Sequence, residues 1–125
     1  MNPVRRHATE DQVPFGRKEA VAFAQLLTAV AHEHGMAAAQ KNTAQLPRSV
    51  SRDRIGLDFA IAEECGRWDK SQDYRDVFDD HVIIIEYRLM DFDKTCADVG
   101  DALPVVLRDV EVTAPGSSSY RYLDC

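Results

Sequence analysis

The chain has 125 residues, a formal net charge of −6, and 45 % hydrophobic against 29 % charged residues. These values are typical of one globular domain, so they exclude a globally disordered chain. No apolar run approaches the ~20 residues needed to cross a bilayer, and no signal-peptide core follows the basic residues near the start. We therefore expect a cytoplasmic protein that does not interact with a membrane.

Residues 1–15 are polar and hold two prolines, so we predict a flexible N-terminal arm before a single domain over residues 16–125. From Arg17 to His34, alanine and larger apolar residues recur at helical spacing. We predict a helix there, which Gly35 ends or bends before residues 36–41 continue it. Residues 42–52 have the composition of a connecting loop.

Residues 54–66 carry two conflicting signals. Ile55, Leu57, Phe59 and Ile61 alternate with small or polar residues, which is the period of a strand. The alanine and glutamate content and the closing Gly66 are typical of a helix that ends at a glycine. Both interpretations stay open, and we favour the helix.

The second half of the chain predicts a mixture of helices and strands. A short helix is expected over 69–81 because Tyr74, Val77 and Phe78 share one face with His81. The β-branched run after His81 predicts a central strand. The expected order is strand 82–90, helix 91–103, strand 105–113, turn 115–119 and strand 120–123. Together these elements predict an α+β fold, with two or three helices packed on a small, mainly antiparallel β-sheet.

Acidic residues are concentrated after Trp68. Residues 69–125 hold six Lys/Arg against thirteen Asp/Glu, a balance of −7, whereas residues 1–68 have a balance of +1. Four aspartates in the predicted helix 69–81 are spaced to form one stripe, and like charges at this spacing destabilise a helix. The stripe is either a solvated helix face or a surface that attracts a basic partner. The residues predicted to bind a partner are Trp68, Asp69, Asp73, Asp76, Asp79, Asp80, Asp98 and Asp101.

The segment Asp91-x-Asp93-x7-Asp101-Ala102-Leu103, between two predicted strands, offers carboxylates for a divalent cation. It is similar to a stretch of the RusA family of Holliday-junction resolvases, which are magnesium-dependent nucleases. By this resemblance Asp91, Asp93 and Asp109 would be the metal ligands. Lys94 and Ala97 stand where that family has asparagine and lysine. Helix capping by Asp91 or Asp93 is the simpler interpretation.

The other chemically active side chains do not form a motif. Cys65, Cys96 and Cys125 are an odd number of cysteines at wide spacing, which predicts free thiols, with an incidental intermolecular bond at Cys125. Glu63 and Glu64 are adjacent, and adjacent helix residues do not face one another. We predict no catalytic residue and no cofactor.

The charge distribution therefore favours a binding protein rather than an enzyme. We expect a small acidic inhibitor of a basic, nucleic-acid-handling protein, of immunity or phage anti-defence type, acting as a nucleic-acid mimic. Such a protein would not bind nucleic acid directly, because affinity for nucleic acid depends on Lys and Arg. Two alternatives remain: a magnesium-dependent nuclease, and a phage or mobile-element structural component. The sequence leaves the identity of the partner and the oligomeric state open.

Overall fold

The structure, a computed structural model, describes residues 14–125 and contains a five-stranded sheet with strand order β1-β2-β3-β4-β5. β1 to β4 pair in parallel, and β5 pairs antiparallel with β4. The strands are β1 (Ala39–Lys41), β2 (Phe59–Glu63), β3 (Val82–Glu86), β4 (Val105–Arg108) and β5 (Tyr122–Asp124). The helices are α1 (Arg17–Glu33), the π-helix η2 (Ser49–Ile55), α2 (Cys65–Trp68), α3 (Ser71–Phe78) and α4 (Leu89–Val99).

The prediction of an α+β fold with a mainly antiparallel sheet was therefore wrong. A helical segment lies between each successive pair of parallel strands, and such a crossover returns the chain to the same edge of the sheet, so the next strand runs parallel. The architecture is α/β, with one antiparallel strand added at the edge.

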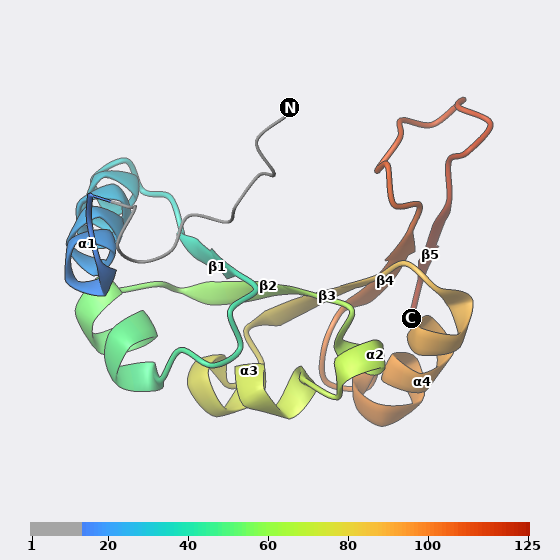
Figure 1. Cartoon of the computed structure of the whole chain (residues 1–125). Helices are drawn as coiled ribbons and strands as arrows, with labels where there is room; N and C mark the ends of the chain where they lie inside the picture. Colours follow the sequence, from blue (N-terminus) through green and yellow to red (C-terminus); the bar gives the residue numbers. More distant parts are fainter. Residues whose placement is uncertain (1–13) are drawn as a thin grey trace, which may run out of the picture.

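Four helical segments, η2, α2, α3 and α4, cover the same face of the sheet (Figure 1). The strand residues on this face are fully buried, and Phe78 of α3 packs against them. The opposite face carries the alternate residues, and the segment between β4 and β5 rises beyond it (Figure 1). The main core therefore lies between the sheet and one helical layer. Its fully buried strand residues include Ala60, Ala62, Ile84, Val105 and Leu107.

Helix α1 confirms the prediction for residues 17–33, but its packing differs from the pattern of its apolar residues. Val21 packs with Val50 and Ile55 of η2 in a small second core, whereas Phe23 and Leu27 are more than half exposed. The helix does not continue through residues 36–41 as predicted. Gly35 adopts a left-handed conformation (φ +69°) directly after the helix, and residues 39–41 form β1.

Within residues 54–66, the middle follows its strand pattern rather than its helical composition, whereas Ile55 ends η2 and Cys65 begins α2. Ala60 and Ala62 are buried while Phe59, Ile61 and Glu63 are half-buried, which is the period-two alternation of β2. The predicted helix that covers these residues was therefore wrong, because tertiary burial decided between two weak local preferences. The predicted strands 82–90 and 105–113 are shorter than expected, ending at Glu86 and Arg108.

The predicted N-terminal arm lies almost entirely outside the described residues. Within residues 14–125, none of the helices combines the length and apolar character that crossing a bilayer requires.

Candidate active site

The carboxyl ends of the four parallel strands meet at one edge of the sheet, which is where α/β proteins place their ligand and active sites. β1 leads to Asn42, β2 ends at Glu63, and β3 leads to Tyr87. The register aligns Glu63 with Ile85, so Glu63 and Tyr87 lie on the face of the sheet that the four helical segments leave uncovered. This edge therefore brings together polar side chains that are far apart in the sequence.

Glu63 is the centre of this group. Its carboxylate accepts hydrogen bonds from the Tyr87 hydroxyl and from Asn42 Nδ2 at 2.8 Å, and Lys41 Nζ lies 3.1 Å away. Asn42 Oδ1 also accepts a hydrogen bond from the Glu63 backbone N–H at 2.9 Å. The hydrogen bonds from Tyr87 and Asn42 lower the pKa of Glu63 from 4.5 to about 2. The Glu63 carboxylate is therefore fixed in position by its partners and ionised at neutral pH.

Tyr87 is the matching proton donor. Burial, and then its hydrogen bond to Glu63, raise the pKa of Tyr87 to about 12. The hydroxyl therefore keeps its proton, and this pairing fixes the orientation of the Glu63 carboxylate.

The backbone at this edge adopts unusual conformations. Asn42, Thr43 and Glu64 all have positive φ angles, of 57°, 66° and 55°. Non-glycine residues rarely adopt this region, and such residues concentrate at functional sites. These conformations turn the chain sharply after β1 and β2 and position the side chains that follow.

A cleft of about 370 Å³ opens beside Glu63. Trp68 is 58 % exposed on its wall, and the Arg67 guanidinium lies over the indole ring at 4.7 Å from its centroid. Arg67 also pairs with Glu64 at 3.2 Å. The cleft therefore combines carboxylates, an amide, an ammonium group and an aromatic ring. Its lining residues are Asn42, Glu63, Glu64, Trp68, Lys70 and Tyr74.

A second cleft, of about 470 Å³, lies at the amino ends of β2 and β3 and includes Asp58 and His81. Asp58 already accepts hydrogen bonds from His32 Nε2 at 2.8 Å and from the Ala38 N–H at 2.7 Å, and these two bonds lower its pKa. In parallel sheets the amino edge contributes to stability and the carboxyl edge to chemistry. The cleft beside Glu63 is therefore the candidate active site.

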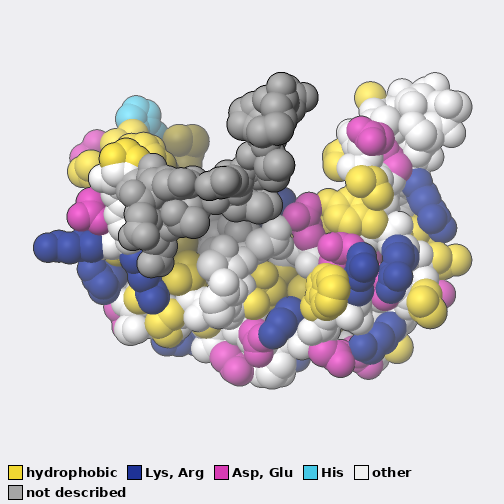
Figure 2. Space-filling model, in the orientation of Figure 1, with side chains coloured by type: hydrophobic (Ala, Val, Ile, Leu, Met, Phe, Trp, Pro, Cys, Tyr) yellow, Lys and Arg dark blue, Asp and Glu magenta, His cyan; other side chains and the backbone are white. Residues whose placement is uncertain are grey.

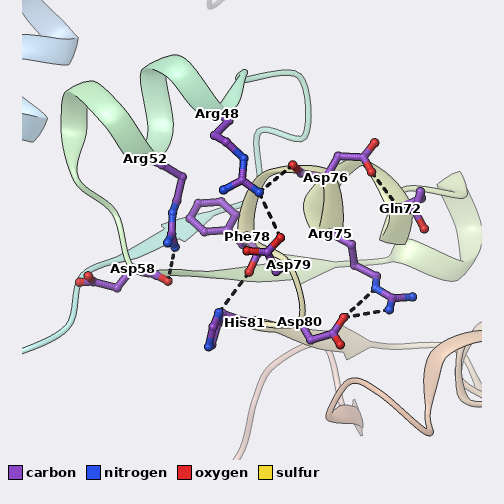
Figure 3. A network of polar contacts seen from close by, with 10 residues as sticks. All are labelled: Arg48, Arg52, Asp58, Gln72, Arg75, Asp76, Phe78, Asp79, Asp80 and His81. Carbon is purple, nitrogen blue, oxygen red and sulfur yellow. Dashed lines mark hydrogen bonds and ion pairs between the residues drawn. The ribbon is translucent and has the colours of Figure 1, made fainter.

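The aspartate stripe does not form one coherent negative patch. Arg48 reaches Asp79 at 3.2 Å, Arg75 reaches Asp80 at 2.8 Å, and the Asp76 carboxylate accepts from Gln72 (Figure 3). Basic and acidic side chains also alternate across the helical layer in the space-filling view (Figure 2). The chain's own cations thus compensate much of the charge on which the predicted partner surface depended. Two further pairs are Asp69 with Lys94 and Asp73 with Lys70.

The remaining residues of the predicted partner surface lie apart from that helix. Asp98 lies in α4, on a small pocket between α2, α3 and α4, and Asp101 is exposed after α4. Trp68 is exposed as the partner interpretation requires, but it lines the cleft beside Glu63. The predicted role of these residues in binding a protein stays a prediction.

The three aspartates of the alternative metal site have separate structural roles. Asp91 is buried in the first turn of α4 and pairs with Arg88 at 2.5 Å, whereas Asp93 is exposed. Asp109 accepts from the Thr113 and Arg121 N–H groups, and these bonds lower its pKa to about 2. Across residues 14–125, His, Cys, Asp and Glu side chains form no cluster that could hold a metal ion.

The expectation of three free thiols was also wrong. Cys96 of α4 and Cys125 after β5 form a disulfide, with 6.0 Å between their Cα atoms. Cys65 is a free, buried thiol, and burial raises its pKa to about 11. The wide sequence spacing hid this pair, because α4 and the edge strand meet only in the folded chain.

A mainly parallel α/β sheet with a carboxylate-lined cleft at its carboxyl edge is an arrangement typical of enzymes. A comparison with protein families gives the particular assignment: the chain belongs to glycoside-hydrolase family GH114, whose family model matches residues 5–124. No curated protein and no solved structure matches the chain.

This family membership corrects the functional predictions. The chain is related to carbohydrate-active enzymes, so the expectation of a non-enzymatic inhibitor of immunity or anti-defence type was wrong. The nuclease and the phage structural component were wrong for the same reason. The sequence interpretation also missed Glu63, because it dismissed the Glu63-Glu64 pair as adjacent helix residues. The period-two pattern of residues 55–61 was the signal that placed Glu63 at the end of a strand.

Proposed function

We propose that this protein hydrolyses glycosidic bonds in the cleft beside Glu63. Most glycoside hydrolases use two carboxyl groups: one protonates the leaving oxygen, and the other acts as a carboxylate on the opposite side of the sugar. The observation that carries the proposal is the ionised Glu63, held by Tyr87, Asn42 and Lys41 at the carboxyl edge of a parallel sheet.

Glu63 takes the role of the carboxylate in this proposal. A pKa of about 2 keeps it ionised across the physiological range, as a nucleophile or a base requires. In a retaining reaction the carboxylate attacks the anomeric carbon while the bond to the leaving oxygen breaks, and water then hydrolyses the glycosyl ester. In an inverting reaction the same carboxylate removes a proton from the attacking water. The anomeric form of the first product, followed by NMR, distinguishes the two.

Glu64 is the second carboxyl group on the cleft, and its side chain forms an ion pair with Arg67 at 3.2 Å. This ion pair suits Glu64 to contact the bound sugar rather than to act as the acid, because an acid must carry a proton.

The test compares wild type with Glu63→Gln on a panel of polysaccharides, measuring the reducing ends released. We expect the substitution to lower kcat on the order of 10³-fold, because the amide cannot act as nucleophile or base. Glu33→Gln, at the exposed end of α1, is the matched control and should retain full activity. Equal activity of Glu63→Gln and wild type would refute the assignment.

The predicted cytoplasmic location stays a prediction. The Cys96–Cys125 disulfide is an argument against it, because disulfides persist mainly in oxidising compartments.

A further inference from the structure

The exposed Trp68 is an unusual residue for the polar edge on which it lies. Its side chain is 58 % exposed, although it carries a large apolar ring whose burial would contribute to stability. Glu63 and Glu64 line the same cleft, so the ring lies beside charged groups rather than within an apolar patch. An exposed aromatic ring in a polar cleft is typical of a ligand contact.

The turn that carries Trp68 is held at both ends. Lys94 Nζ donates to the Gly66 carbonyl at 3.1 Å and to Asp69 Oδ1 at 2.7 Å, and these two residues flank Trp68 closely in the chain. Gly66 itself packs against α4 so closely that an added Cβ would lie 2.6 Å from the Asp91 carbonyl oxygen. The backbone that carries the ring is therefore fixed before a ligand binds. Binding then costs little conformational entropy of the protein.

The ring itself is also positioned. Arg67 lies over the indole at 4.7 Å and is held by its ion pair with Glu64 at 3.2 Å. This contact links the orientation of the indole to the Glu64 carboxylate on the same cleft.

From this arrangement we propose that Trp68 is the stacking platform of a saccharide-binding subsite adjoining Glu63. This inference rests on the proposed function. A pyranose ring has an apolar C–H face and a rim of hydroxyls. The indole matches the face, and the amide, ammonium and carboxylate groups of Asn42, Lys70 and Glu64 match the rim.

The size and polarity of the cleft suit a sugar. Its volume of about 370 Å³ lies within the ~300–1,000 Å³ range of small-ligand sites. Its carboxylates are paired with the chain's own cations, Glu63 with Lys41 at 3.1 Å and Glu64 with Arg67 at 3.2 Å. The cleft therefore offers both donors and acceptors to the hydroxyls of a sugar ring.

The experiment uses the fact that Trp68 is the only tryptophan of the chain, so its fluorescence reports this subsite alone. Wild type and Glu63→Gln are titrated with oligosaccharides of galactan, xylan and β-glucan. We expect a saturable change in emission with at least one of these oligosaccharides. No change with any of them would overturn the inference.

A kinetic test separates this inference from the proposed function. On a polysaccharide that wild type cleaves, Trp68→Ala should raise KM about 3- to 10-fold with little change in kcat, because a stacking contact is worth about 0.5–1.5 kcal/mol. Trp68→Phe should recover most of the loss. Phe23→Ala, which removes an exposed aromatic ring from α1, is the matched control and should leave KM unchanged. An unchanged KM in Trp68→Ala, with Glu63→Gln inactive, would refute the subsite and leave the proposed function intact.

Discussion

Glutamates on the two faces of the sheet have pKa values shifted in opposite directions. Glu63 and Glu86 are the last residues of neighbouring strands, and the register sends them to opposite faces. Glu63, on the face without the four helical segments, accepts from Tyr87 and Asn42, and its pKa falls to about 2. Glu86, under the helices, is fully buried, and burial raises its pKa.

Burial explains the raised pKa of Glu86, and its two hydrogen bonds only partly oppose it. Gly66 N–H and the Thr95 hydroxyl both donate to Oε1, at 2.7 and 2.8 Å, while Oε2 finds no partner among the described residues. One face thus supplies donors that stabilise a charge, and the other supplies apolar packing that disfavours it. A fully buried glutamate and an ionised glutamate beside a cleft thus lie on opposite faces of a single sheet.

Replacing a strand residue on each face should give the largest difference in the free energy of unfolding. Ile84→Ala removes a fully buried side chain from the covered face and should lower the free energy of unfolding by about 4 kcal/mol. Ile83→Ala removes a side chain that is 36 % exposed on the other face and should cost less than about 2 kcal/mol. Urea unfolding measures both values. Equal losses would contradict the assignment of the main core to one face.

The disulfide is a second source of stability on the helix-covered side. Cys96 and Cys125 are 29 residues apart, and loop-closure entropy gives such a cross-link about 3–4 kcal/mol. We expect Cys96→Ser/Cys125→Ser to lose this amount in urea unfolding. Adding a reductant should destabilise wild type but not the double variant. An equal reductant effect in the double variant would contradict the assignment of this effect to the Cys96–Cys125 bond.

Glu86→Gln tests the raised pKa of the buried glutamate. The pKa of Glu86 is raised on folding, so its contribution to stability is complete below its unfolded value of about 4.5 and is lost as the pH rises through its folded value. The glutamine variant has no such loss. Its free energy of unfolding should therefore exceed that of wild type increasingly with pH, with a slope of at most about 1.4 kcal/mol per pH unit. Parallel curves for the two proteins would contradict this prediction.

Tyr87→Phe should give the smallest effect, with the opposite pH dependence. It removes one hydrogen bond to the Glu63 carboxylate, which should cost about 1.5 kcal/mol at pH 7. Because the pKa of Glu63 is lowered on folding, its contribution is present above about pH 5 and is lost as the pH falls towards 2. The difference between variant and wild type should therefore shrink in acid. A constant difference would indicate packing rather than hydrogen bonding.

The sequence predicted local elements better than their arrangement. Helix α1 and the buried face of α3, with Tyr74, Val77 and Phe78, follow directly from periodicity. The direction of the strands did not follow, because a run such as Val82–Glu86 reads the same in a parallel and an antiparallel sheet.

The candidate site was less predictable for a related reason. Asn42, Glu63 and Tyr87 are separated by more than twenty residues from one to the next, and only the parallel register brings them together. The charge count drew attention to the aspartates instead. That count could not show that Arg48 and Lys94, which are distant in the sequence, reach Asp79 and Asp69.

The strand order also has a consequence for how the chain acquires its structure. Each strand from β2 to β5 pairs with the strand that precedes it in the sequence. During synthesis a newly emerged strand can therefore add to an edge that already exists, without waiting for a distant segment. Assembly can proceed stepwise from β1 to β4, and the antiparallel β5 then closes the growing edge.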